Sequence, residues 1–112
     1  MPKRLSDLFD GQNIRDMDPG VIYKVVSENI KEIDSKDFTK ILDELPWQAQ
    51  VKLMKQRCVE ANDKMACMAY DLAINGDPSA PVGTAKNLGL KGLALNEDNR
   101  FAKELLQELG EL

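Results

Sequence analysis

Apolar side chains recur along this chain at steps of three and four residues, the spacing that places them on one face of an α-helix. The last clear example gathers Phe101, Ala102, Leu105, Leu106 and Leu109 on a single face. No segment alternates apolar and polar residues over the length of a strand. The pattern therefore predicts an all-α fold, an irregular orthogonal bundle of about five or six short helices.

Cap and break residues divide this pattern into separate helices. Asp18-Pro19, Ser35 and Asn96 are typical of helix starts, and Gly76 and Gly110 are typical of helix ends. The expected helical segments are a short piece within 3–17, then about 19–33, 36–45, 47–61, 65–74, a glycine-weakened helix within 82–95, and 97–109. We expect residues 1–17 to form an N-terminal arm and residues 18–112 to form one helical domain.

The bundle is expected to be built around a helical hairpin over residues 46–74. Pro46 cannot donate a helical hydrogen bond and so forces a break, and the pair Asn62-Asp63 supplies the turn. The second arm of the hairpin, residues 65–74, contains a single charged residue, Asp71. Its other side chains are apolar on nearly every side, so we expect it to be buried and a charge at Met68 to prevent folding.

Size and composition then limit the class of protein. A chain of 112 residues can bury a core without metal or disulfide support. A net charge of −4 argues against a protein whose main work is to neutralise phosphate. The chain lacks both the roughly 20-residue apolar run of a membrane span and the apolar core of a signal peptide at its start. Together with only two cysteines, expected to be core thiols, this predicts a cytoplasmic protein.

The residue types argue against catalysis. Histidine, the commonest general base and metal ligand, is absent. Cys58 and Cys67 lack a neighbouring base and are too few for a zinc site, and most carboxylates fall on solvated helix faces or caps. Asp71 is the exception, since it is the only charge on an apolar helix and could pair with a lysine or mark an interface. We expect no catalytic residue, no metal site and no cofactor.

Two groups of residues are candidates for partner contacts. The apolar side of the arm and the basic side of the third long helix supply the six predicted contact residues: Leu5, Leu8, Phe9, Lys52, Lys55 and Arg57. The leading interpretation is a non-catalytic adaptor or assembly subunit that binds another protein or a further copy of itself. The alternative is a small regulator that contacts nucleic acid through the lysines and Arg57, together with Lys64.

Part of the chain resembles a known family. From Ile22 to Lys55 the order of residues is similar to that in the smallest, all-helical subunit of the actin-filament-branching complex. The residues that carry this resemblance are Ile22, Lys24-Val25-Val26, Asp37-Phe38, Lys40, Leu45 and Leu53-Met54-Lys55. It covers less than a third of the chain and implies a scaffold that presents helices to other proteins.

Overall fold

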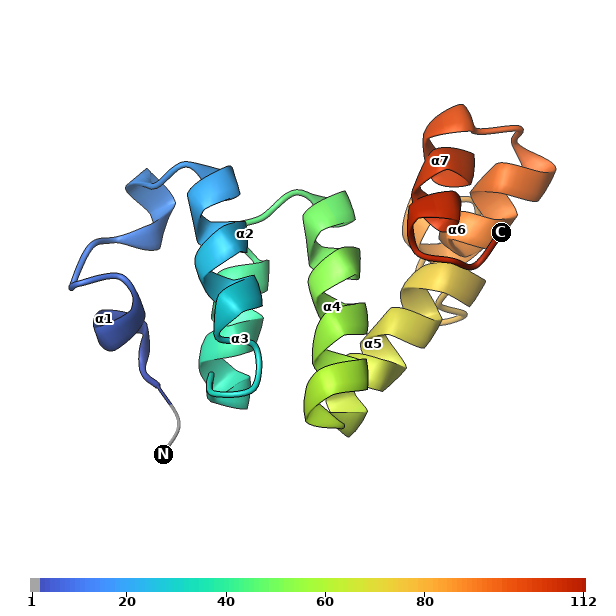
Figure 1. Cartoon of the computed structure of the whole chain (residues 1–112). Helices are drawn as coiled ribbons and strands as arrows, with labels where there is room; N and C mark the ends of the chain where they lie inside the picture. Colours follow the sequence, from blue (N-terminus) through green and yellow to red (C-terminus); the bar gives the residue numbers. More distant parts are fainter. Residues whose placement is uncertain (1–2) are drawn as a thin grey trace. The chain divides into compact units, whose positions relative to one another are not determined.

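The computed structural model describes residues 3–112, and these contain helices and no strand. The predicted all-α fold class is therefore confirmed. The elements, drawn in chain order in Figure 1, are α1 (Leu5–Leu8), a 3-10 turn η1 (Ile14–Asp16), α2 (Pro19–Glu28), α3 (Ser35–Leu42), α4 (Trp47–Ala61), α5 (Lys64–Asn75), α6 (Ala85–Asn96) and α7 (Arg100–Glu108). They form two compact units: unit 1 ends at Asp63, and unit 2 is Lys64–Leu112.

In unit 1, α2 packs against α4 and is shorter than expected. The predicted helix to about residue 33 is wrong, because α2 ends at Glu28. The Asn29 side-chain amide donates to the carbonyl of Val25 at 2.8 Å, which competes with continuation of the helix. The chain then turns, and Ile33 forms an isolated parallel bridge with Lys3.

The core of unit 1 comes from every one of its longer helices. Its fully buried side chains are Ile22, Val26, Ile41, Val51 and Leu53. The bounds of α4 match the expected 47–61. Of its apolar side chains that recur at steps of three and four residues, only Val51 is buried, and the others are half-buried: Trp47, Met54, Cys58 and Ala61. Leu53 and Arg57 are buried instead.

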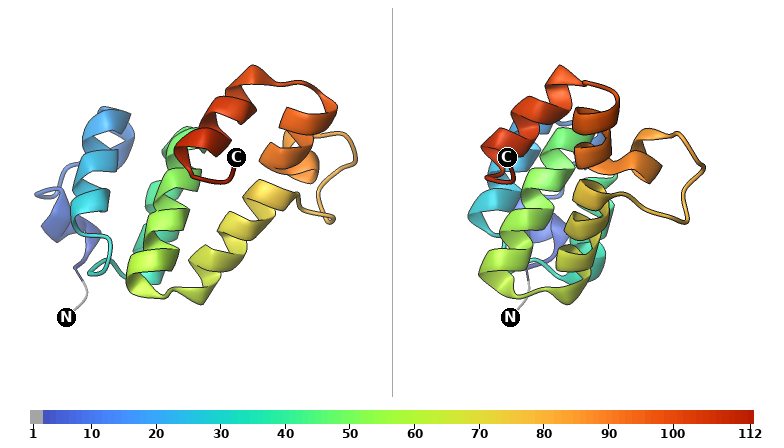
Figure 2. Two further views of the ribbon diagram at one scale, coloured as in Figure 1. Left: turned by 45° about the vertical axis from the view of Figure 1, so that its right-hand side comes forward. Right: turned by 90° about the vertical axis from the view of Figure 1, so that its right-hand side faces the viewer.

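In unit 2, α6 packs against both α5 and α7. The connection from α5 to α6 leaves the helices as an extended excursion, visible in both views of Figure 2. The side-chain amide of Asn87 donates to the carbonyls of Asp77 and Ala80, at 3.2 and 3.3 Å, and so ties this excursion to α6. The last helix starts later than expected, at Arg100, because Asn99 rather than Asn96 accepts the capping hydrogen bond.

Two glycines set the close approach of α5 and α6. Gly76 ends α5 with a φ of 101°, as expected for a left-handed terminator, and Gly89 interrupts α6 with a φ of 71°. A Cβ on either glycine would collide with the backbone of the other segment. The helix expected to be weakened by its glycines is therefore packed closely against the end of α5 at Gly89, where the absence of a side chain is essential.

The expectation that residues 65–74 are buried on almost every side is wrong. Only Ala66 and Ile74 of α5 are buried, whereas Met65, Met68 and Leu72 are 71%, 61% and 39% exposed. Lys64, Asp71 and Asn75 are exposed as well. In residues 3–112 no helix combines the length and the apolar character needed to cross a membrane.

We expect Gly89→Ala to unfold or strongly destabilise unit 2, because the new Cβ meets the backbone around Gly76 and the residue must hold a positive φ. Amide hydrogen exchange over residues 64–112 measures this as a loss of protection. Gly83→Ala is the matched control, since Gly83 also has a positive φ, of 85°, but faces open space. It should cost only about 1–2 kcal/mol, and equal effects of the two variants would contradict the close-approach argument.

Candidate interaction surface

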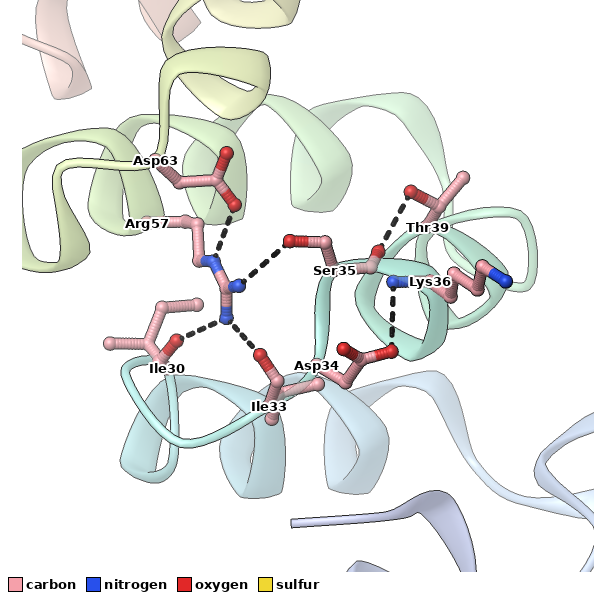
Figure 3. Close-up of polar contacts among 8 residues, drawn as sticks. All are labelled: Ile30, Ile33, Asp34, Ser35, Lys36, Thr39, Arg57 and Asp63. Carbon is pink, nitrogen blue, oxygen red and sulfur yellow. Dashed lines mark hydrogen bonds and ion pairs between the residues drawn. The ribbon is translucent and has the colours of Figure 1, made fainter. Parts of the chain in front are cut away.

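Of the predicted contact residues, Arg57 has the best-defined surroundings, and it lies inside unit 1. Its Nη1 donates to the carbonyls of Ile30 and Ile33 at 2.7 and 2.6 Å, and its Nε donates to Asp63 at 2.9 Å (Figure 3). Its Nη2 donates to the Ser35 hydroxyl at 3.5 Å. The guanidinium also lies 5.1 Å from the centroid of the Phe38 ring, within the range of a cation–π contact.

This arrangement explains how the chain can leave α2 without burying unpaired backbone groups. The carbonyls of Ile30 and Ile33 lie outside any helix, and the guanidinium of Arg57 donates hydrogen bonds to both. Arg57 is buried, with 6% of the residue exposed. Asp63 balances the buried charge, with 13% of its side chain exposed. Arg57 therefore holds the α2–α3 connection against α4, and we do not retain it as a partner-contact residue.

The remaining predicted contact residues divide between the arm and α4. Phe9 is buried in the core at 4% exposure, whereas Leu5 and Leu8 are half-buried. Lys52 and Lys55 are also half-buried. The six residues thus do not form one exposed surface. Phe9 and Arg57 both have too little exposed area to contact a partner protein.

Polar contacts hold the arm to unit 1. The ammonium of Lys3 lies 2.9 Å from the Glu32 carboxylate and donates to Asn29 at 2.8 Å. Arg4 lies 3.4 Å from Asp37, whose side chain is 5% exposed. The segment expected to form an N-terminal arm is attached at its start by ion pairs and further along by the buried side chain of Phe9.

An open cavity of about 270 Å³ lies where α2 and α4 begin. Its lining consists of Pro19, Gly20, Tyr23, Pro46, Gln48, Ala49 and Lys52. The ionisable side chains of this lining are the amine of Lys52 and the phenol of Tyr23.

The titratable groups elsewhere are held in structural contacts. Cys58 and Cys67 are joined in a disulfide, which corrects the expectation of two core thiols and removes both as nucleophiles. In the described part of the chain, no three His, Cys, Asp or Glu side chains lie together in a way that could hold a metal ion. Partial burial, and then the hydrogen bond to Glu111 at 2.7 Å, raise the pKa of Tyr70 well above its usual range.

The exposed face of α5 is the surface that the sequence interpretation missed. Met65, Met68 and Leu72 are spaced at i, i+3 and i+7, which places them on one face of the helix. We call these three residues the α5 stripe. Lys64 and Asp71 are exposed and lie seven residues apart, so they share one edge of the same helix. The signal in the sequence was the pair of methionines, which suit an adaptable binding surface as well as a core.

Comparisons with known proteins give no relative. No family model matches the chain, and neither a curated protein nor a solved structure matches it. The resemblance of residues 22–55 to the small actin-complex subunit therefore stays a prediction.

We expect Arg57→Ala to destabilise unit 1 by about 3–5 kcal/mol, because it removes the buried cation that pairs with Asp63 and the donor to the carbonyls of Ile30 and Ile33. Urea unfolding followed by the fluorescence of Trp47, the only tryptophan, reports on this unit. Lys24→Ala removes the same charge from an exposed position and should change stability by about 0.5 kcal/mol or less. A similar small change in both variants would contradict the assigned role of Arg57.

Proposed function

We propose that the protein is a non-catalytic helical adaptor or assembly subunit that acts through protein–protein contacts. The observation that carries this proposal is the α5 stripe. Two of its three large apolar side chains are more than half exposed, although they belong to one face of a regular helix. Contiguous apolar surface of this kind is typical of interaction sites, whereas single exposed apolar residues are common on any protein.

The energetics favour coverage of this face. Burial of a methionine or leucine side chain contributes about 1.5–3 kcal/mol relative to full exposure. The exposed parts of the three stripe residues therefore represent a few kcal/mol of binding free energy on that scale. Methionine has an unbranched, flexible side chain that adapts to the shape of a partner. The stripe thus suits a helix or groove with apolar side chains of its own.

The other expectations from the sequence support this proposal unequally. The resemblance to a helical subunit of a larger complex points to the same kind of role. The nucleic-acid alternative depended on a basic patch, and Arg57 of that patch is inside unit 1 and bonded there. We therefore do not propose it. The absence of enzymatic activity stays a prediction.

The cytoplasmic location also stays a prediction, and the disulfide opposes it. Disulfides form and persist mainly in oxidising compartments and are rare in the reduced cytosol. The bond between Cys58 and Cys67 therefore makes an oxidising compartment the stronger proposal.

We expect Met68→Glu to abolish partner binding without unfolding the protein, because the residue is 61% exposed and a carboxylate there would have to lose water in any apolar interface. Affinity purification of wild type and variant under identical conditions, with mass spectrometry, measures the loss of any partner. Circular dichroism checks that the variant remains folded.

Leu95→Glu is the matched control for this experiment. It places the same acid at an apolar position of unit 2 that is 75% exposed but belongs to α6 and not to the stripe. It should leave partner binding unchanged. The proposal would be wrong if Met68→Glu retained every partner of the wild type, or if both variants lost the same partner.

A further inference from the structure

We infer that the α5 stripe is covered by the same stripe of a second copy of this chain, with the two α5 helices antiparallel. This inference rests on the proposed function and names the partner for its contact surface. It comes from the spacing of the stripe and from the charges at its edge.

The spacing of the stripe is nearly symmetric about Met68. Met65 lies three residues before it and Leu72 four residues after it, so the ends are about one helical turn from the centre. When two antiparallel helices meet with Met68 against Met68, Met65 of each copy lies opposite Leu72 of the other. A two-fold dimer requires this kind of self-complementary surface, in which residue i contacts residue j and residue j contacts residue i.

The charges at the edge of the stripe select the antiparallel orientation. Lys64 and Asp71 sit on the same edge, one near each end of the stripe. In the antiparallel register, Lys64 of one copy lies opposite Asp71 of the other, and the two-fold axis makes this pair twice. A parallel two-fold pair would instead place this edge of one copy beside the Ala69 edge of the other, so neither ion pair could form. Asp71 accepts a hydrogen bond from Asn75 at 2.8 Å through one oxygen, which leaves acceptor positions for a lysine.

The opposite edge of the stripe permits close approach of the two helices. Ala69 lies there, one residue beyond Met68, and its small side chain lets a facing helix come near. The apolar side chains of the stripe would then fill the space between the helices on one side of this contact. Both edges of the face are thus suited to a helix packed along it.

The size of the face sets the strength of the dimer. A helix of 12 residues is about 18 Å long, and three stripe residues cover much less than the roughly 800 Å² per partner of a standard interface. The net charge of −4 on each copy adds a general repulsion. We therefore expect a reversible dimer with a Kd in the micromolar range, seen at high protein concentration and lost on dilution.

Cross-linking of single cysteine variants tests the register. Both native cysteines are in the disulfide, so an added cysteine is the reactive thiol. With a short thiol-specific bis-maleimide, Met68→Cys should cross-link to a dimer, because the two copies of this position meet at the axis. Leu72→Cys is the matched control and should not cross-link, since it lies opposite Met65 of the other copy. Equal cross-linking of both variants would indicate parallel helices and would overturn the inference.

Charge reversal tests the ion pairs in the intact protein by sedimentation equilibrium. Lys64→Glu alone and Asp71→Lys alone should each weaken the dimer by roughly tenfold, because two exposed pairs change from attraction to repulsion. The double variant restores opposite charges and should return the Kd to within about threefold of the wild type. An additive loss in the double variant would overturn the pairing.

The same measurements separate this inference from the proposed function. A wild type that stays monomeric at high concentration overturns the dimer. If that monomer still retains a different protein that Met68→Glu loses, the adaptor function stands and only the identity of the partner was wrong. If it retains none, both are wrong.

Discussion

The central physical constraint in this protein is that a small helical unit cannot surround one of its own helices. Unit 2 has three helices, and α5 buries only Ala66 and Ile74 fully, while Tyr70 reaches Glu111 near the C-terminus. A unit of this size has a high ratio of surface to volume, so part of an apolar helix must remain in water. The apolar surface of α5 is larger than the area that the other two helices of its unit bury. The α5 stripe is the result, and it is the basis of the function that we propose.

A different kind of interaction holds the helices together in each unit. In unit 1 the buried guanidinium of Arg57 replaces the helical hydrogen bonds that the chain gives up after α2. In unit 2 the closing contact is backbone against backbone, where Gly89 meets the segment at Gly76. The first depends on a charge that stays paired with Asp63 and the second on the absence of a side chain. The first holds the α2–α3 connection against α4, and the second holds α6 against the end of α5.

The sequence was sufficient for the fold class and for most helix positions, because periodicity and cap residues are local signals. It placed α4 correctly and marked α6 as a helix weakened by its glycines. It failed where a distant group decided the outcome. The connection after α2 is held by Arg57 of α4, and this predicted contact residue is interior for the same reason. The predicted burial of α5 was wrong because apolar composition shows which side chains favour burial. It does not show whether the chain has enough other helices to bury them.

Oxidation of methionines in dilute solution tests the central claim most directly. With hydrogen peroxide and mass spectrometry, the rates at Met65 and Met68 can be compared with that at Met54, which is half-buried on α4. We expect both stripe methionines to be oxidised several-fold faster than Met54 in dilute protein, and to be protected as the protein concentration rises. Rates at Met65 and Met68 as slow as that of Met54 at every concentration would show that α5 is covered within a single chain and would contradict this account.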